Sequence, residues 1–148
     1  MDRNDFEQRD HFMLSLPTIP DERGKLAVVE GGRFLPFEIQ RVYYLFDVPA
    51  GAERGGHAHL DLQQLLIAIS GSFTVDVESA EGKATYTLNR PNEALYIGSL
   101  VWREMRNFSS NAVCLVLASH LYTESDYIRS YDVFKQKLNG ESHASSIR

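Results

Sequence analysis

The sequence predicts an all-β protein, an antiparallel β-sandwich or jelly-roll barrel that ends in a short C-terminal helix. Many short apolar runs follow one another at intervals of roughly ten residues, and turns rich in Gly, Pro or Asn separate them. The segment 72–78 alternates between apolar and polar side chains, which is typical of a strand with one face in the core. After His120 the apolar period becomes helical. The 148 residues fit a single domain, with a core over about 12–134.

Ten short segments, most of them predicted strands, are expected to form the sheets of this sandwich or barrel. In chain order they lie at 12–16, 25–30, 38–48, 57–59, 65–69, 72–78, 84–88, 93–98, 102–108 and 112–119. Residues 1–11 are interpreted as a mobile leader or a short pairing arm, and 21–24 as a turn. The strand at 38–48 carries apolar side chains on both faces, so we expect both faces to be covered.

The region after His120 is predicted to contain one amphipathic helix. Its apolar and aromatic residues recur at i, i+4, i+7 and i+11, namely Tyr127, Tyr131, Phe134 and Leu138. This stripe is interpreted as a surface that packs against the sheets. Thr123 with Asp126 is a candidate cap at the start of the helix, and the polar residues 139–148 are predicted to form a flexible tail.

Composition and charge exclude several classes of protein. Hydrophobic residues make up 43% and charged residues 24%, and the formal net charge of −5 leaves no general basic surface for nucleic acid or anionic membranes. No apolar run approaches about 18 residues, so no transmembrane helix is predicted. The charged start of the chain predicts no secretory signal, and the single Cys114 lies in an apolar run as a candidate core thiol. Together these features favour a cytoplasmic protein.

Two histidines two residues apart are the strongest candidates for chemistry. If His57 and His59 lie in a strand, both imidazoles project to the same face and share one space. A turn-forming run at 53–56 precedes them, and the apolar run at 65–69 follows. Imidazole changes its charge near neutral pH, so such a pair is suited to acid–base chemistry.

The spacing around this pair resembles the first motif of the cupin superfamily. Gly51, His57, His59, Gln64 and Gly71 follow one another with five, one, four and six residues between them. In that motif the position of Gln64 is usually Glu, and this Glu binds a metal ion together with the two histidines. Glutamine brings no charge to a divalent ion, so this departure weakens the metal site.

The second cupin motif supplies one more histidine ligand, and its counterpart in this chain is Arg103. A guanidinium is a permanent cation and would repel a metal ion. Two of the four ligands are therefore missing. The resemblance implies a cupin-like pocket without metal or cofactor, whose histidines are free for acid–base work.

Four local runs in this order resemble the sugar-nucleotide 3,4-ketoisomerases. They are RVYY at 41–44, RGGHAH at 54–59, WREM at 102–105 and DYIRSYD at 126–132, and the resemblance extends over about 24–134. Those enzymes are metal-free cupins that move the keto group of dTDP-4-keto-6-deoxy-D-glucose from C4 to C3 through an enediol(ate). Their products lead to 3-amino sugars of surface polysaccharides, including the O-antigen of lipopolysaccharide. Family members are homodimers with strand exchange, which implies a second copy of this chain as partner.

The resemblance also implies site residues. The acid–base histidines of the family map onto His57 and His59, and a tyrosine at the sugar maps onto Tyr43. We predict His57 as the base at the ring carbon and His59 as the proton shuttle between the two oxygens, with the reverse assignment open. The predicted substrate-binding residues are Arg23 and Arg54 at the diphosphate, Gln64 beside the histidines, and Arg103 and Glu104 in the pocket. Many relatives have His in place of Arg103, which leaves the C4 configuration of the product open.

Three other functions fit parts of the pattern. A dTDP-sugar 3,5-epimerase uses a similar pocket with a histidine and a tyrosine, although its motifs differ from RGGHAH and DYIRSYD. A non-catalytic cupin would bind the sugar nucleotide and leave it unchanged. A metal-dependent cupin oxygenase is disfavoured by Gln64 and Arg103.

Overall fold

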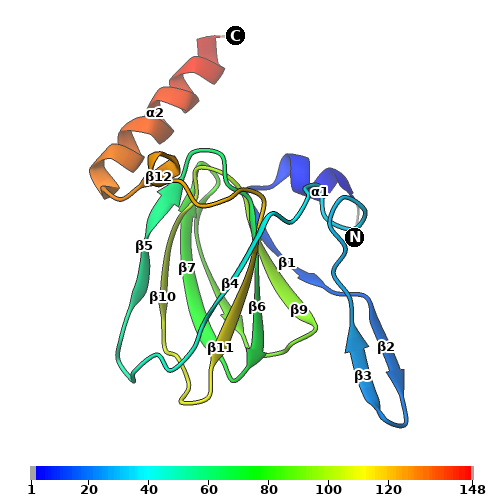
Figure 1. The fold of residues 1–148 in the computed structure, drawn as a ribbon. Helices are drawn as coiled ribbons and strands as arrows, with labels where there is room; N and C mark the ends of the chain where they lie inside the picture. The colour runs from blue at the N-terminus through cyan, green and yellow to red at the C-terminus, as the bar shows by residue number, and fades with distance from the viewer. Residues whose placement is uncertain (1–2, 148) are drawn as a thin grey trace.

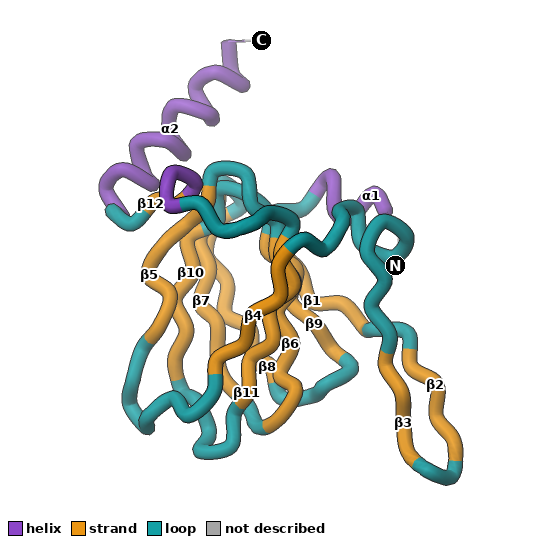
Figure 2. The backbone as a smooth tube through the Cα atoms, viewed as in Figure 1, coloured by secondary structure: helices purple, strands orange, loops and turns teal. Residues whose placement is uncertain are grey.

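The structure is a computed structural model that describes residues 3–147, and two antiparallel five-stranded sheets form its body (Figures 1 and 2). The strands are β1 (His11–Ser15), β2 (Thr18–Asp21), β3 (Gly24–Ala27), β4 (Arg41–Leu45), β5 (Arg54–His59), β6 (Gln64–Ser70), β7 (Phe73–Ser79), β8 (Gly82–Leu88), β9 (Glu93–Ile97), β10 (Trp102–Arg106), β11 (Val113–Ala118) and β12 (Tyr127–Ile128). The helical segments are α1 (Arg3–Gln8), a 3₁₀ turn (Glu124–Asp126) and α2 (Tyr131–Ile147). The predicted all-β sandwich with a C-terminal helix is confirmed.

The main core lies between the two sheets. One sheet has the strand order β1-β9-β6-β11-β4, and the other has the order β12-β5-β10-β7-β8. Alternating apolar side chains from both inner faces meet in the core, with Leu66, Phe73, Val75 and Val116 among its buried members. Cys114 belongs to this core, as predicted, and burial raises the pKa of its thiol to about 12.

A second apolar cluster covers the outer face of the first sheet. Phe6 of α1 lies edge-on against Phe12 and Tyr96, with ring centroids 5.1 and 4.9 Å apart. The prediction of a mobile leader is therefore wrong for residues 3–11, because Phe6 anchors a short helix and β1 pairs with β9. Met1 and Asp2 lie outside the described residues.

β4 forms one wall at the edge of the first sheet, next to β11. Arg41 and Tyr43 are half-buried on its inner side, whereas Val42 and Tyr44 on its outer side are 55% and 60% exposed. The prediction that both faces of this strand are covered is thus wrong within this chain. No other strand or helix in the described part of the chain packs over Val42 and Tyr44 on this edge strand.

β2 and β3 form a two-stranded hairpin that projects away from the sandwich (Figures 1 and 2). The turn predicted at 21–24 lies at its tip, and the strand predicted at 25–30 ends earlier, at Ala27. Ile19 and Leu26 on this hairpin are large apolar residues that remain exposed.

The C-terminal helix begins later than predicted. Tyr127 and Ile128 do not belong to it, because they form β12 and pair with His59 and Ala58 of β5. The predicted cap residues Thr123 and Asp126 lie at the start and the end of the 3₁₀ turn instead of at the start of α2. The side chain of Thr123 makes no capping hydrogen bond in this described turn. The helical spacing of the aromatic residues therefore led to a wrong assignment, because Tyr127 lies in a two-residue strand and not in the helix.

α2 docks through its first half and then extends away from the sheets (Figure 1). Phe134 and Leu138 pack against Trp102 and Ala58, as predicted for the apolar stripe. The helix continues through Ile147 rather than giving way to a tail at residue 139, and Arg148 lies outside the described residues. No helix within residues 3–147 is long and apolar enough to span a membrane.

Candidate active site

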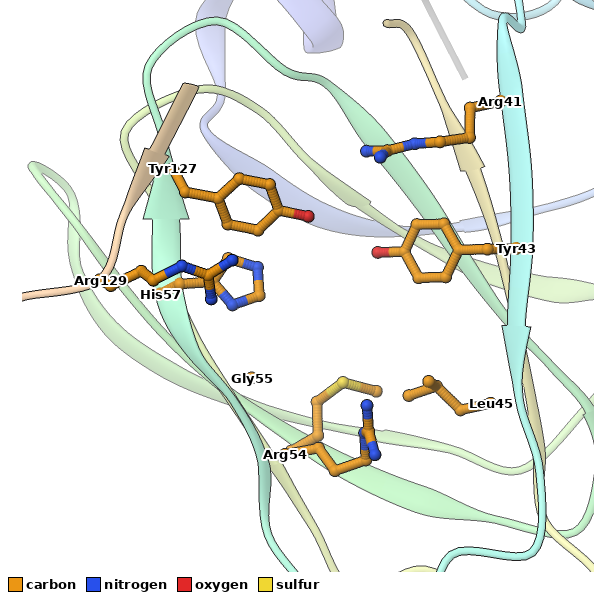
Figure 3. Close-up of a pocket in the computed structure, with 9 residues that line it drawn as sticks. Arg41, Tyr43, Leu45, Arg54, Gly55, His57, Tyr127 and Arg129 are labelled. Carbon is orange, nitrogen blue, oxygen red and sulfur yellow. The ribbon is translucent and has the colours of Figure 1, made fainter. Parts of the chain in front are cut away.

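A cavity of about 350 Å³ opens between β4 on one side and β5 with β12 on the other (Figure 3). These strands come from different sheets, so the cavity lies at an open edge of the sandwich. Its walls carry several cations and aromatic rings together with one histidine. The lining residues are Arg41, Tyr43, Leu45, Arg54, Gly55, His57, Met105, Tyr127 and Arg129.

Strand alternation explains the pairs of residues on each wall. Arg41 and Tyr43 are two residues apart on β4, and Tyr127 and Arg129 are two residues apart at β12, so each pair faces the same way. The hydroxyl groups of Tyr43 and Tyr127 point toward one another from opposite walls (Figure 3). Burial raises the pKa of Tyr43, although the Arg103 charge opposes this, so its hydroxyl remains a proton donor at neutral pH.

His57 is the cavity's histidine. One of its ring nitrogens donates a hydrogen bond to the backbone carbonyl of Gly55, which leaves the other nitrogen as an acceptor. Burial, and then the positive charge of Arg103, lower the pKa of His57 to about 4. At neutral pH this imidazole is therefore uncharged and able to accept a proton.

His59 projects to the same side as His57, as predicted, but lies deeper and does not line the cavity. Its side chain is 1% exposed, and its ring centroid lies 4.8 Å from that of His57 and 4.4 Å from that of Tyr127. Its Nδ1 lies 3.0 Å from Oδ2 of Asp126. Burial and the Arg103 charge lower the pKa of His59 to about 2, so this contact joins a neutral ring to a carboxylate.

Arg103 is a buried cation beside both histidines, and it lies opposite His57 in the β10–β5 pairing. Its Nη1 donates to Oε1 of Gln64, and Gln64 Nε2 donates to the Tyr43 hydroxyl at 2.9 Å. Its Nε donates to the carbonyl of Val101 at 3.3 Å, and its Nη2 has no hydrogen-bond partner among the described side chains and backbone. Among residues 4–140, whose side chains the structure describes, no carboxylate forms an ion pair with Arg103.

Gly55 allows β5 and β10 to approach each other at the cavity. Its φ of +94° lies in a region that favours glycine, and a Cβ there would lie 2.9 Å from the Arg103 carbonyl oxygen. The register between the two strands shifts at this point, between Arg103 and Glu104. Arg103 lies opposite His57 on one side of this shift, and Glu104 lies opposite Gly55 on the other.

Comparison with known proteins identifies the relatives of this chain. Residues 9–139 match the family described as FdtA, WxcM-like C-terminal. The chain belongs to the FdtA family. The TDP-4-oxo-6-deoxy-α-D-glucose-3,4-oxoisomerase of Aneurinibacillus thermoaerophilus is 44% identical over 126 residues, which cover 85% of this chain and 91% of the relative.

Solved structures support the same assignment. A 3,4-ketoisomerase from Helicobacter canadensis is 44% identical, with a TM-score of 0.83 over 88% of this chain and 98% of that one. A 3,4-ketoisomerase variant from Thermoanaerobacterium thermosaccharolyticum, solved with TDP-4-keto-6-deoxyglucose, is 39% identical, with a TM-score of 0.85 over 88% and 95%. The predicted resemblance to sugar 3,4-ketoisomerases is confirmed.

Most of the predicted site residues come together in this FdtA-family chain. Tyr43, Arg54 and His57 line the cavity, while His59, Gln64 and Arg103 lie directly behind its wall. The structure does not bring Glu104 to the cavity, since it follows Arg103 in β10 and faces the other side of the sheet. There it accepts a 3.4 Å hydrogen bond from the Trp102 indole.

Arg23 also lies away from the cavity of its own chain. It is at the tip of the projecting hairpin, where its side chain is 86% exposed and pairs with Asp21 at 3.1 Å.

Sequence reasoning missed three residues that line the cavity. Tyr127 was interpreted as helix packing, but it lines the cavity because β12 pairs it with His59. Arg41 and Arg129 also line the cavity, and each lies two residues from a cavity tyrosine. Period-two alternation around Tyr43 could have found Arg41, whereas no local pattern separates β12 from the helix that follows.

Proposed function

We propose that this chain isomerises dTDP-4-keto-6-deoxy-D-glucose to the 3-keto sugar. The observation that carries the proposal is the neutral His57, which has a free acceptor nitrogen and lies in a cavity whose opposite wall offers the Tyr43 hydroxyl. A histidine with a pKa of about 4 can accept a proton throughout the neutral range, as a general base requires.

The reaction needs only proton transfers. His57 removes the proton from C3, the C3–H electron pair forms the C3=C4 double bond, and the C4 carbonyl pair moves onto its oxygen to give an enediolate. The C3 hydroxyl then loses its proton and becomes the carbonyl, while C4 and its oxygen take up protons. No atom or electron is gained or lost overall, so no oxidant or cofactor enters the scheme.

Two groups assist at the oxygens. The hydroxyls of Tyr43 and Tyr127 point toward one another across the cavity, so they can donate to O3 and O4 and pass a proton between them. This assignment replaces His59 as the shuttle, because His59 does not line the cavity. The positive charge of Arg103 behind the wall favours the negative charge that develops on the enediolate.

The arginines at the cavity suit a diphosphate. Arg41, Arg54 and Arg129 line it, and guanidinium groups bind phosphate oxygens through planar, charge-assisted bonds. The Arg41 guanidinium lies 5.4 Å from the ring centroid of Tyr43, close to the proposed sugar site. The proposed enzyme is metal-independent, since the Gln64–Arg103 hydrogen bond occupies two positions that hold metal ligands in other cupins.

The proposed active unit is a homodimer with strand exchange, built from a single catalytic domain. The exposed Ile19 and Leu26 of the hairpin and the exposed outer face of β4 supply apolar surfaces for it. In such a dimer Arg23 would reach the cavity of the partner subunit and bind the diphosphate there. The product would pass in the cytoplasm to transamination, toward 3-amino sugars of O-antigen-type polysaccharides.

Mixing two inactive variants tests the exchange. Arg23→Ala and His57→Asn dimers are each expected to have low activity, and subunit exchange between them should restore activity. If the hairpin serves the partner's cavity, the mixed dimer contains one cavity with both residues intact. If the hairpin serves its own cavity, every cavity in the mixture lacks one residue and no activity returns.

Proton NMR in deuterated water tests the reaction itself. Wild-type protein with dTDP-4-keto-6-deoxyglucose is expected to give the 3-keto sugar with deuterium at C4, and the coupling constant at C4 identifies its configuration. Label at C5 would indicate a 3,5-epimerase instead. A sugar that binds but stays unchanged would indicate a non-catalytic binding protein, and either result contradicts the proposal.

A further inference from the structure

Asp126 is the one carboxylate in contact with a histidine of the site among residues 4–140, whose side chains the structure describes. It lies at the end of the 3₁₀ turn, one residue before β12, and its backbone carbonyl accepts the Leu60 N–H at 2.9 Å. Its Oδ2 lies 3.0 Å from Nδ1 of His59, and its Oδ1 accepts the backbone N–H of Asp61 at 2.8 Å. Both oxygens are therefore engaged, and the carboxylate is fixed in orientation.

This contact determines where His59 carries its proton. A carboxylate only accepts hydrogen bonds, so Nδ1 must be the protonated nitrogen and Nε2 must carry the lone pair. Nε2 is buried and has no hydrogen-bond partner within the described residues. Because burial and Arg103 keep the pKa of His59 at about 2, the ring stays neutral, and the position of its single proton depends on its partner.

His59 in turn supports the reacting groups. Its ring packs against both His57 and Tyr127, which line the cavity, whereas His59 itself does not. Asp126 also lies close enough to Arg103 to act on its charge, so it offsets part of a buried cation that has no ion-pair partner in the described part of the chain. The orientation of the His59 ring therefore affects the positions of His57, the proposed base, and Tyr127, a proposed proton donor.

We propose that Asp126 is a positioning residue of the isomerase, which holds the proton of His59 on Nδ1 and thereby keeps His57 and Tyr127 in their reactive arrangement. This role rests on the proposed function, because it assumes that His57 and Tyr127 act on the sugar. Asp126 itself does not line the cavity and acts only through His59.

Asp126→Asn is the sharpest test, because it changes the charge and the donor pattern at nearly constant size. The Asn carbonyl oxygen can keep the bond from the Asp61 N–H, and its NH₂ group then faces His59 Nδ1. Nδ1 would have to accept, so the His59 proton would move to Nε2. We expect kcat to fall by about 10²-fold, since an aspartate-to-asparagine change that disturbs a histidine tautomer costs up to ~10⁴-fold in a serine protease triad.

The readouts separate positioning from folding. Long-range ¹⁵N–¹H NMR of the imidazoles, without substrate, should show Nδ1–H for His59 in wild type and Nε2–H in Asp126→Asn, while the Kd for TDP changes less than about threefold. Asp126→Glu restores the carboxylate and should recover part of kcat together with the Nδ1–H form. Asp61→Asn changes an exposed acid between β5 and β6 that bonds Asp126 through its backbone N–H, and it should keep wild-type kcat and the wild-type tautomer.

Two results overturn the role of Asp126 alone: an active wild type with unchanged kcat in Asp126→Asn, or a lower kcat with an unchanged His59 tautomer. Loss of folding in Asp126→Asn together with failure of Asp126→Glu to recover kcat would also overturn it, as the residue would then be structural. A wild-type protein that leaves the sugar unchanged overturns the proposed function instead, and with it any catalytic role of this pair.

Discussion

His57→Asn is expected to lower kcat by about 10³-fold, which lies within the 10²–10⁴-fold contribution of a positioned general base. Asparagine has similar size, and its amide can still donate to the Gly55 carbonyl, but it cannot take up a proton. Binding of TDP should stay within about threefold of wild type, because the arginines that line the cavity are unchanged. Steady-state kinetics of the isomerisation and calorimetric titration with TDP measure the two effects.

His120→Asn serves as the matched control, since His120 is exposed and does not line the cavity. It should retain wild-type kcat. Residual activity of His57→Asn above roughly a tenth of wild type would show that another group removes the C3 proton, contrary to the general-base contribution assumed here.

The pH dependence follows from the lowered pKa of His57. The base is uncharged above about pH 4, so kcat/KM should be level through neutral pH and fall only as the pH approaches that value. Stability behaves differently, because the unfolded imidazole has a pKa of 6.5 and binds more protons than the native one between that value and about 4. Stability therefore decreases as the pH falls below 6.5, and urea midpoints should drop before the base is protonated.

Arg103→Met is expected to lower kcat by about 10²-fold by removing the buried positive charge near the developing enediolate. The same change should move the acid limb of the kcat/KM profile to higher pH, because the Arg103 charge lowers the pKa of His57. Burial remains the larger cause of that shift, so the limb should stay below pH 6.5. A pH–rate profile of the variant measures both effects.

Stability of Arg103→Met should change little. Gln64 loses a donor, which costs about 1–3 kcal/mol, and removal of a buried, unpaired guanidinium offsets this. Arg106→Met is the control on the same strand, since Arg106 pairs with Asp76 on the outer side and should leave kcat unchanged. An Arg103→Met enzyme with an unmoved acid limb would mean that this charge does not act on His57.

Patterns that extend over one strand made the sandwich, His57, Tyr43 and Arg54 predictable. Alternation and turn residues are local, so they can be read from neighbouring positions, and three of the four family motifs, RVYY, RGGHAH and WREM, lie within single strands. The same alternation argues against Glu104 as a pocket residue, because it directly follows Arg103 in a strand and faces the opposite side.

Contacts between distant segments were not predictable. Asp126 lies 67 residues from His59, and only the pairing of β12 with β5 brings them together. Tyr127 shares a helical period with Tyr131, so periodicity assigned it to α2 although the hydrogen bonds of β12 hold it beside His59. The spacing of His57 and His59 predicted their common direction but not their different depths.

β4 would join the proposed dimer contact and the proposed active site in a single strand. The inner side of β4 carries Arg41 and Tyr43 of the cavity, and its outer apolar side is exposed. β4 pairs with β11 along one of its two edges. In the proposed dimer, a partner subunit that covers that outer side would also stiffen the proposed sugar-binding wall, since an uncovered edge strand frays more readily than a central one. Dilution of the enzyme would then loosen its own active site, and specific activity would depend on protein concentration.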